Sequence, residues 1–191
     1  MKALVLVPAV LVFASGCIGA APKAPKKWSV EWSRLVFDRS DLAELPPVKL
    51  MSVDVRAPYG GTNMPVLRAD GSIAFDSFNA FAAPPASLLK GAAFDALESS
   101  CAFERVVSGA SAVRTPLSIE VYVKKLALDC RKEEHRDATV ALTLVLTSNM
   151  SVVASSSAEA TVPVTDGNFA SAFSSAFSEA MLSAVGRLEA R

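Results

Sequence analysis

The stretch LSIEVYVKKLALD, residues 117–129, decides the fold of this chain. Apolar and polar side chains alternate along it as far as Lys124, which is the two-residue period of a strand with one buried face. The phase then shifts at Lys124-Lys125, and Leu126 and Leu128 continue the apolar set, so a β-bulge is expected there. The segment therefore predicts one long, half-buried strand.

Two more strands and a helix follow this stretch. Residues 140–146 and 152–164 keep the two-residue period, and the charged segment 131–137 before them is expected to form a turn. Thr165 or Asp166 can cap a final helix. One side of that helix is apolar and consists of Phe169, Phe173, Phe177, Met181, Ala184 and Leu188. We interpret this side as packing on the sheet, and contact with a lipid cargo is the alternative.

The N-terminal half of the chain predicts shorter elements. Strands are expected at 28–32, 48–55, 65–68, 72–78 and 103–107. A turn at Asp70-Gly71 would join the third of these to the fourth. Pro84-Pro85 suits the start of an amphipathic helix over 84–99. Together the elements predict an α+β fold, a mostly antiparallel β-sheet with two main helices packed on one face.

Composition limits the classes of function. The chain has 191 residues, which suits one domain, and its 19 basic residues balance its 19 acidic ones, so the charge gives no reason to expect a nucleic-acid partner. Hydrophobic residues make up 51% of the chain, which argues against disorder. With one His and three widely spaced Cys, neither a metal site nor a cofactor is expected.

The N-terminus predicts export and lipid attachment. Lys2 is followed by an apolar run from Ala3 to Phe13 and then by Ala14-Ser15-Gly16 directly before Cys17. This order is typical of a bacterial lipoprotein signal, cut before a Cys that then carries acyl chains such as palmitate. An ordinary signal peptide with an incidental Cys is the alternative. We expect residues 1–16 to be the signal peptide.

The residues after Cys17 predict where the mature protein resides. Ile18 follows the Cys where inner-membrane lipoproteins usually have Asp, so the periplasmic face of the outer membrane is the expected location. Residues 17–27 are small, basic and Pro-containing, as in a solvated tether. Residues 28–190 are then expected to form a single periplasmic domain.

No catalytic motif stands out in the sequence. His135 lies in the charged segment 131–137, where a solvated turn is the better interpretation than a general base. Gly60-Gly61 lacks the residues of a phosphate-binding loop, and no Ser lies in a Gly-x-Ser-x-Gly motif. We therefore expect no enzymatic activity, and a secreted hydrolase is set aside.

Cys101 and Cys130 are a candidate disulfide. The periplasm is oxidising, so two thiols that remain after lipidation of Cys17 can pair there. The expected strand register places Cys101 opposite Val123, seven residues short of Cys130, which argues against the bond, whereas a bulge near Lys124 would favour it. The sequence leaves both states open.

Residues 53–107 carry a family resemblance. The matching segments are VDVRAPY at 53–59, MPVLR at 64–68, IAFDSFNAFAAPP at 73–85, the helix at 88–97 and FERVV at 103–107. In this order, behind a lipoprotein signal, they resemble the ABC-type transport auxiliary lipoproteins. That family commonly has Tyr at the position of Phe78 and Trp at the position of Phe81. The two Phe residues lack those polar groups and keep the apolar bulk expected to pack.

The resemblance implies a function. It implies an auxiliary or docking subunit, anchored to the outer membrane by acyl chains, that works with an MCE-domain substrate-binding protein and an ABC permease complex. Such a system moves lipids or other hydrophobic molecules across the envelope. A lipid- or hydrophobe-binding carrier lipoprotein is the alternative, and it predicts a large apolar cavity. A homo-oligomer is also expected, because sheet edges are often covered by a second copy.

Overall fold

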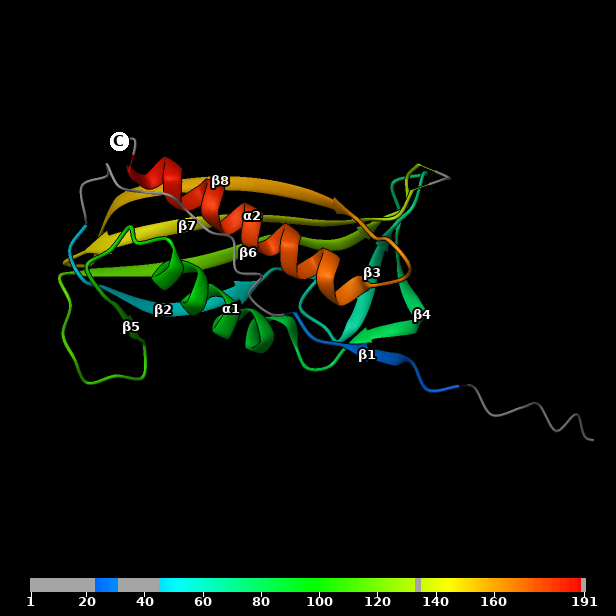
Figure 1. The fold of residues 1–191 in the computed structure, drawn as a ribbon, viewed down its shortest axis with the longest axis horizontal. Coiled ribbons are helices and arrows are strands. Elements are labelled where there is room, and N and C mark those ends of the chain that lie inside the picture. The colour runs from blue at the N-terminus through cyan, green and yellow to red at the C-terminus, as the bar shows by residue number, and fades with distance from the viewer. Residues whose placement is uncertain (1–22, 31–44, 133–134, 190–191) are drawn as a thin grey trace, which may run out of the picture.

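The structure is a computed structural model that describes residues 23–30, 45–132 and 135–189 (Figure 1). Its strands are β1 (Lys26–Trp28), β2 (Val48–Val55), β3 (Asn63–Leu67), β4 (Ile73–Phe81), β5 (Val106–Ser108), β6 (Leu117–Asp129), β7 (Asp137–Ser148) and β8 (Ser151–Pro163). Its helices are α1 (Pro85–Ser99) and α2 (Phe169–Glu189). The signal peptide, Cys17 and Trp32 lie outside the described residues.

Strand β6 is the central strand of an eight-stranded sheet. Along one edge it pairs in antiparallel register with β7, which pairs in turn with β8. Along the other edge its first half pairs in parallel with β2, and its last two residues pair in parallel with β3. The predicted bulge is confirmed, because the β6–β7 register shifts between Val123 and Lys125. The bulge falls in the part of β6 between its pairings with β2 and with β3.

The smaller strands extend the sheet from β2 and from β3. Strand β5 pairs in parallel with β2, while β4 forms the predicted hairpin with β3 and pairs at its end with β1. The hairpin turns at Gly71, whose φ of 81° lies in the left-handed region that glycine adopts without a steric penalty. Figure 1 shows β1, β3 and β4 gathered at one end of the molecule, with the turn between β7 and β8 at the other.

Both helices cover the same face of the sheet (Figure 1). Helix α2 packs on β7 and β8, α1 packs on β2 and β5, and the two helices contact each other. The predicted apolar side of α2 is confirmed as core, because all of its members are buried. Small residues, among them Ala176 and Ala180, let α2 lie close to the strands, and Ser156 of β8 donates a 2.7 Å hydrogen bond to the Ala184 carbonyl.

The α+β class and the helices on one face are confirmed, but the sheet is mixed. Four of its pairings, β1–β4, β2–β5, β2–β6 and β3–β6, are parallel. The expectation of a mostly antiparallel sheet holds for the β6–β7–β8 meander, where short turns force neighbouring strands to reverse. Strands that are distant in the sequence have no such constraint, and a two-residue period carries no information on strand direction.

Several boundaries differ from those predicted, and three of them have a clear local cause. Strand β1 begins at Lys26, within the expected tether, because its backbone pairs with Asn79 to Phe81 of β4. Strand β5 begins three residues later than expected, and Phe103 instead forms an isolated bridge with Leu45. The cap of α2 is Asn168, whose side-chain oxygen accepts a hydrogen bond from the Ser171 N–H at 3.1 Å, in place of Thr165 or Asp166.

Candidate interaction surfaces

A groove runs along the outer side of α1, where the helix lies over the sheet edge formed by β5. We call it the α1 groove. Its first part has a volume of about 270 Å³ and is lined by Leu50, Lys90, Gly91, Phe94, Asp95 and Ser108. Phe94 is half-buried, while Lys90 and Asp95 are exposed and carry opposite charges. The groove thus combines an aromatic side chain with two side chains of opposite charge, which suits contact with another protein chain.

A second hollow lies on the β1 side of the helix, and we include it in the α1 groove because the two hollows share lining residues. This second part has a volume of about 490 Å³ and is lined by Ser29, Val30, Ser87, Leu88, Gly91, Ala92 and Asp95. Gly91 and Asp95 therefore belong to both parts. A Cβ atom added at Gly91 would meet nothing within 4 Å, so a larger side chain at this position would occupy the groove and leave the core undisturbed.

Ser108, the last residue of β5, lines the groove, and the loop that follows it is held to β2. An added Cβ at Gly109 would lie 2.7 Å from the Leu50 carbonyl oxygen and 3.1 Å from that of Met51, so glycine permits the close approach. The Lys49 ammonium group donates a 2.9 Å hydrogen bond to the Ser111 carbonyl. These contacts hold the loop after β5 in place beside the groove.

A second surface is the outer edge of β4, residues 73–78, which we call the β4 edge. It carries three exposed apolar side chains, with exposed fractions of 39% for Ile73, 49% for Phe75 and 73% for Phe78. The β3–β4 register jumps from Asn63 opposite Ala80 to Pro65 opposite Phe75, so β4 bulges outward over the intervening residues. The bulge presents Phe78 to the surroundings.

The Asp76 carboxylate stabilises this bulge. It accepts hydrogen bonds from the N–H groups of Phe78 at 2.7 Å and Asn79 at 3.1 Å, and from the Asn79 side chain at 2.9 Å. The Asn79 amide oxygen in turn accepts a 2.9 Å bond from the Trp28 indole N–H. Phe78 is therefore held outward by a network that reaches into β1.

The two aromatic positions singled out by the family resemblance differ in role. Phe81 is 1% exposed and packs edge-on against Phe173 with ring centroids 5.6 Å apart, which confirms its packing role. Phe78 packs on nothing comparable, so the expectation that its bulk is buried was wrong. The reason is the spacing, because residues three apart in an extended strand lie on opposite faces, so the burial of Phe81 leaves Phe78 pointing outward.

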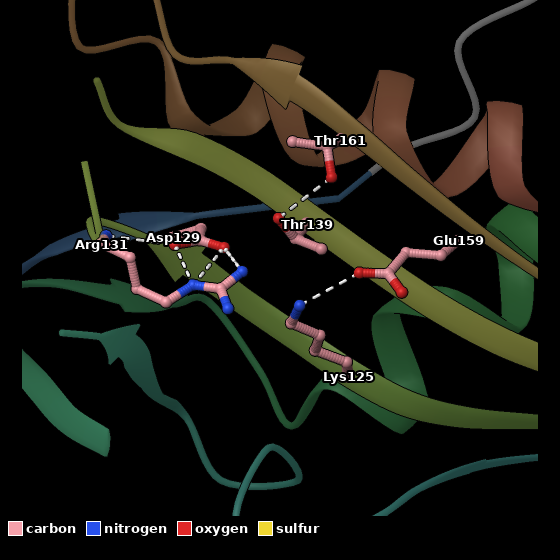
Figure 2. Close-up of polar contacts among 6 residues, drawn as sticks. All are labelled: Lys125, Asp129, Arg131, Thr139, Glu159 and Thr161. Atoms are coloured by element: carbon pink, nitrogen blue, oxygen red, sulfur yellow. Dashed lines mark hydrogen bonds and ion pairs between the residues drawn. The ribbon is translucent and has the colours of Figure 1, made fainter. Parts of the chain in front are cut away.

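A polar cluster occupies the end of the meander on the face opposite the helices (Figure 2). Arg131 donates hydrogen bonds from Nε to both oxygens of Asp129, at 2.9 and 3.0 Å. Lys125 forms a 3.0 Å ion pair with Glu159 across β7. The Thr139 and Thr161 hydroxyls lie 3.3 Å apart and share a hydrogen bond. All of these groups satisfy one another, so the cluster is a structural feature of the sheet surface.

The Arg131 hydrogen bonds hold the pKa of the Asp129 carboxyl below its ordinary value of 3.8. A carboxyl with a lowered pKa in the folded state stabilises the fold above its unfolded pKa. That stabilisation is lost as the pH falls below about 4 toward the lower pKa that the carboxyl has in the folded state. At neutral pH the Asp129 carboxyl therefore stays ionised and paired with Arg131.

Cys101 and Cys130 are both free thiols and lie at opposite ends of β6. Cys101 is close to the Leu45–Phe103 bridge, near the start of β6, and its thiol is exposed. Cys130 lies just beyond the end of β6, where its N–H donates a hydrogen bond to the Leu67 carbonyl. The length of β6 at 3.3 Å per residue, about 40 Å, therefore separates Cys130 from Cys101. A disulfide needs Cα atoms within about 7 Å, so the candidate bond does not form in this fold. Burial raises the pKa of the Cys130 thiol.

The other predicted site residues give no second chemical site. Cys17 lies outside the described residues, and His135 is exposed in the connection between β6 and β7. Within the described ranges, no three His, Cys, Asp or Glu side chains gather closely enough to hold a metal ion. Over the same part of the chain, no helix is both long enough and apolar enough to span a membrane.

Sequence reasoning missed both surfaces described above. The spacing of Phe75 and Phe78 was the available signal for the β4 edge, because residues three apart cannot share one face of a regular strand. Gly91 in the middle of a helix was the signal for the α1 groove, since glycine weakens helices unless space or contact requires it.

The fold has known counterparts among solved structures. A DUF330 family-model protein from Xanthomonas campestris aligns with 87% of this chain and 91% of its own, at 16% identity and a TM-score of 0.61. An uncharacterized protein aligns with 86% of this chain and 98% of its own, at 10% identity and a TM-score of 0.60. A PelC dodecamer subunit from Paraburkholderia phytofirmans aligns more loosely, at 13% identity and a TM-score of 0.46, over 80% and 95% of the two chains. The TM-scores of the first two structures show a shared fold, and at identities this low they show the fold alone.

The sequence itself matches no family model and no curated protein.

Proposed function

We propose that the protein is a lipid-anchored auxiliary subunit of an MCE-type ABC transport system. Cys17 carries the acyl chains, and the domain stands on the periplasmic face of the outer membrane. The role is one of docking and is non-catalytic. The observation that carries the proposal is the Ala14-Ser15-Gly16-Cys17 sequence, followed by a short tether and an α+β domain that accounts for the rest of the chain.

The α1 groove supports the docking part of the proposal. Its two hollows lie along the exposed side of α1, one toward β5 and one toward β1, and the Lys49–Ser111 hydrogen bond holds the loop after β5 beside it. Helix α1 also belongs to the segment 53–107 in which the sequence resembles the auxiliary lipoproteins. The partners in this proposal are the MCE-domain substrate-binding protein and the ABC permease complex, with the domain supplying a preformed surface.

The test is a pull-down from membranes of the native host with matched groove variants. The wild type, Gly91→Trp, Gly91→Ala and Cys17→Ser are each expressed at full length. Wild type and Gly91→Ala are expected to retain an MCE-domain protein or an ABC permease. Gly91→Trp is expected to lose it because Gly91 lines both parts of the groove, and an indole there projects into the space that a partner would contact. Cys17→Ser is expected to leave the outer-membrane fraction.

Two results would contradict the proposal. Co-purification of lipid with no transport component would favour the alternative, a carrier lipoprotein. Equal recovery of the partner by Gly91→Trp and Gly91→Ala would remove the α1 groove from the interface. The Gly91→Ala variant controls for the loss of glycine, because Ala at this exposed helical position stabilises the helix by about 1 kcal/mol relative to Gly and adds only a methyl group.

A further inference from the structure

The β4 edge lacks a strand partner over most of its length. Strand β1 covers only Asn79 to Phe81, and β3 occupies the opposite edge of β4. Within the described residues, the outer edge from Ile73 to Phe78 therefore has no neighbouring strand. Natural sheet edges of this kind are usually protected by charged side chains. Here the one acidic side chain, Asp76, is turned back onto the backbone N–H groups of the bulge.

The exposed side chains of this edge are large and hydrophobic. Ile73, Phe75 and Phe78 lie within six residues, and Phe78 is the most exposed aromatic ring among the described large hydrophobic side chains, at 73%. Exposed apolar side chains gathered along one sheet edge favour contact with another apolar phase. An aromatic ring on a rigid bulge inserts with little further loss of conformational freedom.

The tether enters the domain beside this patch. Strand β1 begins at Lys26, which lies opposite Asn79, the residue after Phe78. Lys23, Lys26 and Lys27 are all exposed at this end of the molecule. Cys17 precedes Lys26 by nine residues, and a chain of that length spans at most about 30 Å when fully extended. Acyl chains on Cys17 hold the β4 edge within that distance of the bilayer.

We propose that the β4 edge rests on the phospholipid leaflet that holds the acyl chains. Phe78, Phe75 and Ile73 enter the boundary between headgroups and acyl chains, while the three lysines contact anionic lipid phosphates. The α1 groove is then held at a fixed orientation to the membrane. This inference rests on the proposed lipidation of Cys17.

The test compares two variants, one with an added Trp at the β4 edge and the other with an added Trp at the far end of the molecule. Phe78→Trp reports on the β4 edge, and Met150→Trp reports on the β7–β8 turn, where Met150 is 103% exposed. The β7–β8 turn lies at the start of β6 and the β4 edge near its end, about 40 Å apart at 3.3 Å per residue. The full lipidated protein is reconstituted into phosphatidylethanolamine and phosphatidylglycerol vesicles, with or without bromine on the acyl chains. Wild-type protein supplies the background emission of the native Trp residues.

Brominated lipid is expected to quench the added emission of Phe78→Trp several-fold more than that of Met150→Trp. Equal quenching at the two positions, or none at residue 78, would overturn the inference. Concentration-dependent change in the Phe78→Trp emission in detergent, without quenching by lipid, would instead assign the edge to a second copy of the chain.

The mass of the N-terminal peptide separates this inference from the proposed function. An acylated Cys17 without quenching at residue 78 overturns the membrane contact alone. A Cys17 without acyl chains overturns the lipid anchor and the contact that depends on it.

Discussion

Cys101 terminates helix α1 in an unfavourable backbone conformation. Its φ of 51° places it in the left-handed region directly after the C-cap, Ser100, a position where glycine is common. The Ser100 hydroxyl fixes the turn by donating to the Leu97 carbonyl at 2.7 Å and accepting from the Ala102 N–H at 3.3 Å. A side chain with a Cβ atom costs about 1–2 kcal/mol in this conformation.

Replacing Cys101 with glycine is therefore expected to stabilise the domain. The gain is expected to reach about 1 kcal/mol, since glycine's larger entropy in the unfolded chain offsets part of the relieved strain. Cys101→Ala, which keeps the Cβ atom, is the control and is expected to change stability little. Urea unfolding of the three proteins measures the difference, and equal midpoints for Cys101→Gly and Cys101→Ala would contradict it.

The sequence did not reveal this role of Cys101. The expected strand at 103–107 begins two residues after Cys101, and nothing in the sequence marked position 101 as a helix end. A left-handed residue is predictable when it is Gly or Asn, which adopt that conformation at low cost, whereas Cys gives no such signal. The same ambiguity left the Cys101–Cys130 pairing open until the strand order was known.

At the scale of the element, Gly109 lets the loop after β5 approach β2. Its missing Cβ leaves room for the Leu50 and Met51 carbonyl groups, and Leu50 is held in place because it pairs with Ser108 of β5 and with Ile119 of β6. Gly109→Ala is expected to destabilise the domain by about 1–3 kcal/mol through overpacking. Gly61→Ala is the control, because an added Cβ there meets nothing within 4 Å. Equal urea midpoints for the two variants would show that the loop relaxes freely.

The elements themselves were largely predictable, and their pairing was not. The predicted strand 48–55 and helix 84–99 agree with β2 and α1 to within one residue, because each has a clear hydrophobic period and a Pro or Gly boundary. The parallel pairing of β2 with β6 depends on contacts between distant segments, which periodicity does not encode. The β4 edge was missed for a related reason, because its bulge breaks the period on which the prediction relied.

Across the whole molecule, hydrogen bonding and burial are concentrated in the meander. Strand β7 pairs along its length with β6 on one side and β8 on the other, and α2 covers its buried face. Strand β5 has three residues and pairs only with β2 within the described part of the chain. The two strands therefore represent opposite extremes of local stability.

Amide hydrogen exchange is expected to reflect this difference. The amides of Leu142 and Leu144 in β7 should exchange only with global unfolding, whereas those of β5 should exchange orders of magnitude faster through local opening. Mass spectrometry of exchanged peptides from the intact protein measures both segments. Protection of β5 equal to that of β7 would contradict the prediction and would indicate that β5 belongs to the same cooperative unit.

The central position of β6 has a consequence for the newly made chain. Strand β2 ends at Val55, yet its partner β6 begins only at Leu117, and β3 likewise depends on the end of β6 for its second neighbour. A chain delivered N-terminus first thus presents β2 and β3 before the strand that joins them exists. Unpaired strands of this kind are prone to aggregate with other chains. Protection of β2 and β3 by chaperones is therefore expected to matter until residue 129 has emerged and β6 can pair with both strands.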